Sequence, residues 1–193
     1  MVRNAYNYDE TELEPVVNNF DPSIIESVYV KDLAERVATL KRVAIGQPAI
    51  DFTMNDMEGN PVSLSSLYGK YLLVDFWLLV RLPADVKTQM WLPLTTSSKT
   101  TVLTYLEFLL TKHRKKWVEA VEADSLTWHH VSDLNYWGNA AGKLYGISSI
   151  PSNILLNPEG VIIAKISARK NCMQNWQNCW VIKNLINSAL FIF

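Results

Sequence analysis

The chain contains no cysteine before residue 172, and its two cysteines, Cys172 and Cys179, lie close together near the C-terminus. Two cysteines alone form neither a zinc site nor a disulfide framework, so we interpret both as incidental thiols. His129 and His130 are adjacent on a predicted strand, where neighbouring side chains point to opposite faces. We therefore expect no metal site, and no residue pattern indicates a cofactor.

The chain also lacks an excess of charge of one sign and a long apolar run. Its 18 Lys and Arg balance 19 Asp and Glu, for a net charge of −1, which argues against a nucleic-acid partner. The apolar residues 185–193 are too few to span a bilayer, and residues 1–6 have no apolar core of an export signal. We therefore expect neither a membrane span nor an export signal.

The most informative segment is an apolar run from Tyr71 to Trp77, interrupted only by Asp75. This pattern predicts a central strand that is buried on both faces of a sheet, and we interpret Asp75 as a buried carboxylate with its hydrogen bonds satisfied. Such a strand normally delivers a functional loop at its carboxyl end. The residues that follow, 78–85, contain no nucleophile and no phosphate-binding loop.

The chain divides into three expected regions. Residues 1–44 form an N-terminal extension: its first 20 residues are polar and acidic, which predicts a loop or a frayed segment. Asp21 and Pro22 are typical of a helix start and predict one or two helices that end near Val43. Residues 45–165 form the main domain, in which 78–114 are atypical and predict no element, and residues 166–193 form an atypical tail.

Strands and helices alternate in the expected main domain. The residue patterns predict a β-hairpin over residues 50–64, helices over 115–122 and 137–145, a strand over 126–131, and a second hairpin of strands 152–156 and 161–164. Together with the buried strand that ends at Trp77, this order predicts an α/β sandwich.

Four segments resemble the AhpC/TSA and TlpA/ResA-like thiol-disulfide oxidoreductases, which are redoxins of the thioredoxin fold. They are Ile45–Phe52, Gly59–Leu64, Gly69–Trp77 and Leu144–Ser152. The resemblance implies a three-layer thioredoxin-like α/β sandwich with an N-terminal helical extension, protein thiols or disulfides as partners, and a location in the bacterial periplasm or cell envelope. It also implies that Ile150 and Pro151 form the family's cis-proline loop, with Pro151 as the candidate cis residue.

The catalytic motif of that family, Trp-Cys-x-x-Cys, is missing from this chain. The chemistry needs two thiols one helical turn apart, the first at a helix N-terminus where the dipole lowers its pKa. The equivalent region here contains Trp77, Val80, Arg81 and Ala84, so we assign no catalytic residue. Dithiol exchange cannot occur at this place. An alternative function is a non-catalytic module that binds a partner through Ile150 and Pro151.

We hypothesise that a shifted reading frame accounts for the missing motif. When the third base of each codon is joined to the first two bases of the next, residues 84–92 can be read as Cys-Arg-Arg-Glu-Asn-Pro-Asn-Val-Val. A second shifted peptide, Ser-Leu-Asp-Lys-Thr-Gln-Glu-Lys, ends directly before Trp117. Over residues 171–181, the same shifted frame can encode only leucine at several positions. These leucines have helical spacing, and a glycine follows them. Near the first cysteine position, the shifted frame allows Cys in register with Val80 and not with Arg81.

The reading-frame hypothesis predicts the nucleotide sequence of the gene. We expect the bases that encode residues 84–92 and 171–181 to contain these alternative peptides in one and the same shifted frame. DNA sequencing across the codons of Trp77 to Trp117, and from Lys165 to the stop codon, measures this directly. Codon choices that exclude the peptides would remove the hypothesis.

Overall fold

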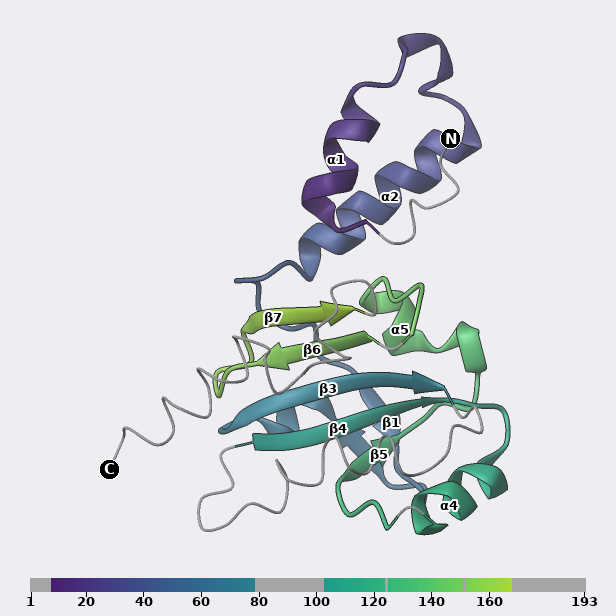
Figure 1. The fold of residues 1–193 in the computed structure, drawn as a ribbon, viewed down its shortest axis with the longest axis vertical. Coiled ribbons are helices and arrows are strands. Elements are labelled where there is room, and N and C mark those ends of the chain that lie inside the picture. The colour runs from purple at the N-terminus through teal and green to yellow at the C-terminus, as the bar shows by residue number, and fades with distance from the viewer. Residues whose placement is uncertain (1–7, 79–102, 124, 151, 168–193) are drawn as a thin grey trace.

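A five-stranded sheet forms the centre of the protein (Figure 1). The computed structural model describes residues 8–78, 103–123, 125–150 and 152–167. The strands lie in the order β5-β4-β3-β6-β7, with β3 (Tyr71–Leu78) in the middle. β3 runs parallel to β4 (Leu103–Leu110), which runs parallel to β5 (His129–Val131). On its other side, β3 is antiparallel to β6 (Ser152–Leu156), which is antiparallel to β7 (Ile162–Ser167).

The predicted central strand is confirmed. Leu72, Val74 and Phe76 are at most 2% exposed and belong to the largest core cluster, which fills one face of the sheet. The ring of Phe76 stacks on that of Phe108 in β4, with 4.9 Å between the centroids. The smaller elements that contribute to this cluster are the hairpin of β1 (Thr53–Asn55) and β2 (Pro61–Ser63), the turn η3 (Leu64–Leu67) and the helix α5 (Ala140–Leu144).

The opposite face of β3 packs against the helix α4 (Arg114–Ala123), which was predicted over residues 115–122. Successive residues of a strand point to opposite faces, so Trp77 points away from Phe76. Trp77 packs with Trp117 and Val121 of α4 in a separate buried cluster. Elements therefore cover both faces of the sheet, as an α/β sandwich requires.

Two expectations about local structure were wrong in the main domain, and a segment to which no element was assigned forms a strand. Residues 104–110, to which the sequence patterns assigned no element, lie in β4, because pairing with β3 along eight residues orders a segment that has no periodicity of its own. The helix expected over residues 137–145 is a short turn, η4 (Tyr136–Gly138), followed by α5, because Asn139 caps a new helix by accepting from the amide of Gly142. The strand expected from residue 126 begins only at His129.

The N-terminal residues expected to be a loop form the helix α1 (Glu10–Asn18). Asp9 accepts from the amide of Glu12, and the Glu12 side chain accepts from the amide of Asp9, so the acidic residues build a capping box. As predicted, Asp21 caps the turn η2 (Pro22–Ile24), and the long helix α2 (Val28–Arg42) follows. Leu13 of α1 is buried with Val37 and Leu40 of α2, which explains why the helix forms despite Pro15.

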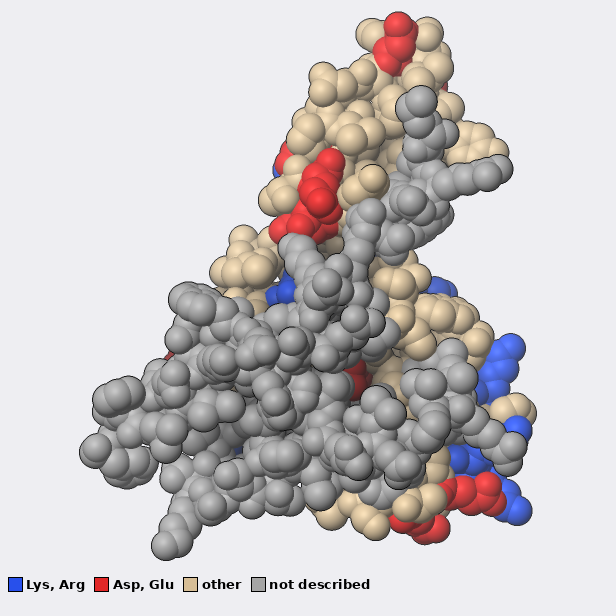
Figure 2. Space-filling view, viewed as in Figure 1, with Lys and Arg blue, Asp and Glu red and all other residues tan. Residues whose placement is uncertain are grey.

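The helices α1 and α2 form a hairpin that stands off the edge of the main domain beside β7 and α5 (Figure 1). Among the described helices, none combines the length and apolar character that crossing a membrane requires. On the face shown in Figure 2, Lys and Arg side chains near α4 lie beside Asp and Glu side chains, so charges of both signs are mixed there. The region boundaries at residues 44 and 165 remain predictions.

The stacked pair of Phe76 and Phe108 leads to a prediction for stability. Replacing Phe76 with Ala removes a side chain that is 0% exposed and leaves a cavity against Phe108. We expect the free energy of unfolding to fall by about 3–5 kcal/mol, measured by urea denaturation. The matched control is Tyr29→Ala, which removes an aromatic ring that is 81% exposed. That change should cost less than about 0.5 kcal/mol, and equal losses in both variants would contradict this assignment of the core.

Candidate functional site

The carboxyl end of β3 lies beside the amino end of β6. Antiparallel pairing places Phe76 opposite Ser152, the residue that follows Pro151. Trp77, the next residue of β3, is 8% exposed, and the half-buried Ile150 belongs to the segment that precedes β6. The fold therefore brings the end of β3 to the end of the segment that contains Ile150, although the two are more than seventy positions apart in the sequence.

The structure locates only some of the predicted site residues. Trp77 and Ile150 are described and come from the two segments that meet at this end of the sheet. Val80, Arg81, Ala84 and Pro151 lie outside the described residues. Cys172 and Cys179 also lie outside them, so the assignment of the motif-equivalent region remains a prediction.

A buried carboxylate lies two residues before Trp77 on the same face of β3. Asp75 is 1% exposed, and its Oδ1 accepts a hydrogen bond of 2.7 Å from Nδ2 of Asn153 in β6. Asn153 is itself 1% exposed and pairs in register with Asp75. A buried carboxylate is tolerated only where polar partners replace water, and Asn153 is such a partner. The prediction that Asp75 is a buried carboxylate with a hydrogen-bond partner is confirmed.

Sequence reasoning did not single out Asn153. The signal was present, because Asn153 is an amide beside three consecutive apolar residues, 154–156, in a strand predicted to be buried. A polar residue in such an apolar run needs a buried hydrogen-bond partner. Asp75 is likewise a polar residue within an apolar run, in the neighbouring strand β3. Only the pairing of β3 with β6 shows that Asp75 and Asn153 are partners.

The backbone register of the sheet places polar residues of β4 and β5 in line with Asp75. His130 in β5 lies opposite Glu107 in β4, which in turn lies opposite Asp75 in β3. His130 is 3% exposed and His129 is exposed, which confirms that the two imidazoles point to opposite faces. Within the described ranges, no three His, Cys, Asp or Glu side chains come together as ligands for a metal ion.

The segment that leads to β6 begins at a tight helix end. Gly146 follows α5 with a positive φ of 66°, and the amide of Ile147 donates to the carbonyl of Gly142 over 2.8 Å. Glycine reaches this conformation without the steric cost that a side chain would add. We call residues 146–150 the α5–β6 loop. Its last residue precedes Pro151, so this loop determines how the chain approaches the end of β3.

Comparisons with known proteins agree with this geometry, although no family model matches the chain. The chain is 23% identical over 141 residues to the thiol-disulfide oxidoreductase ResA of Bacillus thuringiensis (strain Al Hakam), covering 67% of this chain and 73% of that protein. The ResA of Bacillus anthracis matches equally well.

Solved structures match over a similar range. The thioredoxin domain of a thiol-disulfide oxidoreductase from Bacteroides vulgatus is 29% identical with a TM-score of 0.58, over 69% of this chain and 96% of that one. A thiol-disulfide oxidoreductase from Bacteroides fragilis is 26% identical with a TM-score of 0.59, over 72% of this chain and 99% of that one. These similarities confirm the predicted thioredoxin-like α/β fold.

The hydrogen bond between Asp75 and Asn153 can be tested by a double-mutant cycle. Asp75→Ala and Asn153→Ala each remove one side of the hydrogen bond between these two buried side chains, whereas the double variant removes both sides. We expect a coupling free energy of about 1–3 kcal/mol, measured by urea denaturation of the four proteins. Additive losses in the two single variants would show that the contact contributes nothing to stability.

Proposed function

We propose that the site at the carboxyl end of β3 derives from one that exchanges disulfides with protein thiols, because the chain is similar to thiol-disulfide oxidoreductases of the thioredoxin fold. The observation that carries the proposal is the register of Phe76 with Ser152. This pairing joins the strand end where the family's motif begins to the α5–β6 loop, which resembles the family's cis-proline loop.

The reaction of such a site requires sulfur chemistry. A thiolate attacks one sulfur of a disulfide, a mixed disulfide forms while the other sulfur leaves as a thiolate, and a second thiol then releases the product. Residues 1–171 contain no cysteine, and we interpret Cys172 and Cys179 as incidental thiols, so we propose that the chain as written lacks the nucleophile for the first step at this site. We propose that it has kept the scaffold of the site and has lost the reaction.

Asp75 has a specific role in this proposal. Its carboxylate lies on the face of β3 that carries Trp77, and Asn153 holds it by a hydrogen bond of 2.7 Å. A buried carboxylate near a reactive thiol can take up and return the thiol proton. In a protein with thiols after Trp77, Asp75 would be the nearest carboxylate on the strand and Asn153 would orient it.

The relatives favour this proposal over a non-catalytic binding module. Both groups of relatives described above are named for thiol-disulfide exchange. The family resemblance also supports protein thiols and disulfides as the partners, and a bacterial periplasm or cell envelope as the place of action. A binding role for Ile150 and Pro151 then belongs to the recognition of those partners.

An insulin-reduction assay with dithiothreitol tests the proposal. The chain as written should reduce insulin no faster than dithiothreitol alone, because residues 78–171, which follow Trp77, contain no cysteine. A frame-restored protein should raise the rate about tenfold at pH 7, the gain in thiolate fraction when a thiol pKa falls from about 8.5 to about 7.

The control is a frame-restored protein with serine in place of the cysteines that the shifted frame allows in register with Val80 and Ala84, which should return to the rate of dithiothreitol alone. An inert frame-restored protein, or unchanged activity after the serine replacements, would rule out the proposed function. Activity of the chain as written would contradict the proposed loss of the reaction.

A further inference from the structure

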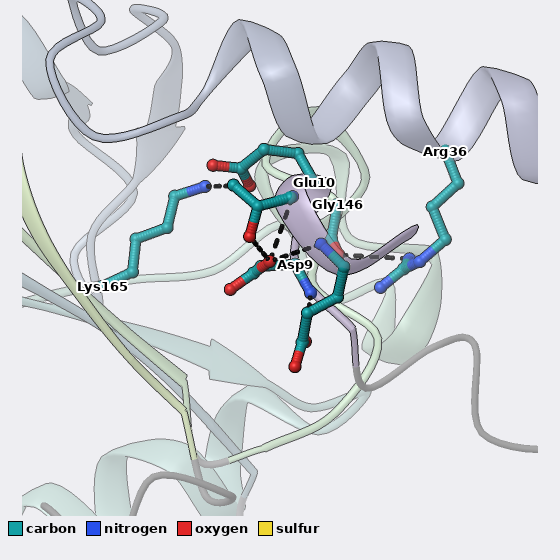
Figure 3. Close-up of polar contacts among 7 residues, drawn as sticks. Asp9, Glu10, Arg36, Gly146 and Lys165 are labelled. Atoms are coloured by element: carbon teal, nitrogen blue, oxygen red, sulfur yellow. Dashed lines mark hydrogen bonds and ion pairs between the residues drawn. The ribbon is translucent and has the colours of Figure 1, made fainter. Parts of the chain in front are cut away.

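The helix α2 lies directly on the α5–β6 loop (Figure 3). A Cβ atom at Gly146 would lie 3.3 Å from both Cδ2 of Leu40 and Cγ2 of Thr39. This spacing is tighter than ordinary van der Waals contact, so a side chain at Gly146 would require Leu40 and Thr39 to shift by a few tenths of an ångström. The N-terminal hairpin is therefore in direct contact with the loop that leads to Pro151.

Arg36 of α2 holds this loop at two points, of which Figure 3 shows the contact with Gly146. Its Nη2 donates to Oγ of Ser148 over 2.9 Å, and its Nη1 donates to the carbonyl oxygen of Gly146 over 3.5 Å. Because the guanidinium group is planar, its two donors have a fixed spacing, and contacts to two acceptors constrain the acceptors relative to each other. Arg36 thus connects Gly146 and Ser148, which lie in the segment that follows α5.

A second contact fixes the hairpin on the sheet. Nζ of Lys165 in β7 lies 4.0 Å from Oε2 of Glu10 in α1 (Figure 3). Burial lowers the pKa of Lys165, and the nearby carboxylates of Glu10 and Asp9 act in the opposite direction. Lys165 pairs in register with Ile154 of β6. The hairpin is therefore anchored both to the loop and to the strand pair that the loop enters.

We propose that Arg36 is a positioning residue for the substrate side of the site. By holding Gly146 and Ser148, it sets the path of the α5–β6 loop and hence the place where the chain meets the end of β3. This inference rests on the proposed function, since it assigns the loop to recognition of a protein thiol or disulfide. A loop held in one conformation before binding loses less conformational entropy when a substrate is bound.

Hydrogen–deuterium exchange on the full chain as it exists tests the positioning itself. Arg36→Met removes both donors, and we expect exchange in residues 143–150 to become about tenfold faster, because the amides of Gly146 and Ile147 lose a support for their helix-end hydrogen bonds. Exchange in β3 and β6 should be unchanged. Arg36→Lys keeps the charge and cannot contact both acceptors with a rigid fork, so it should give an intermediate value.

The matched control is Arg42→Met on the same helix. The guanidinium group of Arg42 donates to Oγ1 of Thr39 within α2 and makes no hydrogen bond to the loop. This variant should exchange as the unaltered chain does. Equal exchange in the Arg36→Met and Arg42→Met variants would overturn the proposal. A uniform rise throughout α1 and α2 would also overturn it, because Arg36 would then only hold the hairpin in place.

Kinetics of the frame-restored protein separate positioning from a purely structural role. We expect Arg36→Met to raise KM for insulin about tenfold and to leave kcat within about twofold, since the reacting thiols are not touched. A loss confined to kcat would contradict the proposal. If the frame-restored protein does not reduce insulin at all, the proposed function fails, and the exchange measurement still decides whether Arg36 positions the loop.

Discussion

The pairing of β3 with β4 along eight residues is the constraint on which the rest of the fold depends. It places Phe76 on Phe108 in the core and brings α4, which follows β4, onto the opposite face against Trp77. A strand in the interior of a sheet requires apolar residues, but many different apolar residues can satisfy that requirement. This explains how residues 103–110 complete the sheet although they adjoin and partly overlap the segment for which we infer a shifted reading frame.

The buried polar contact at the end of the sheet is a different kind of constraint. Asp75 and Asn153 occupy positions that would otherwise hold apolar side chains, and each is 1% exposed. Their hydrogen bond joins the two central strands at the level of the site. Replacement of such a pair by apolar residues is often neutral for stability, so stability alone gives little reason to keep it. A role in proton transfer near a thiol accounts for it within the proposed function.

The N-terminal hairpin connects to this site through the α5–β6 loop. Its own core is small, formed by Leu13, Val37 and Leu40. It contacts the domain through the polar contacts of Arg36 and Glu10 and through the packing of α2 on Gly146. A hairpin anchored in this way can influence the path of a loop without contributing to the main core. The proposed role of Arg36 therefore gives the N-terminal extension a function that its sequence alone does not indicate.

The sequence by itself determined the central strand, the two hairpins, the helix near Trp117 and the resemblance of four segments to one family, because each depends on local periodicity, turn residues or motif spacing. It also determined that no cysteine lies between Trp77 and residue 171. Only the tertiary structure decided that residues 103–110 form a strand, that Asn153 meets Asp75, and that Arg36 reaches Gly146 and Ser148. These features join residues far apart in the chain, and their energy comes from partners that no local pattern can specify.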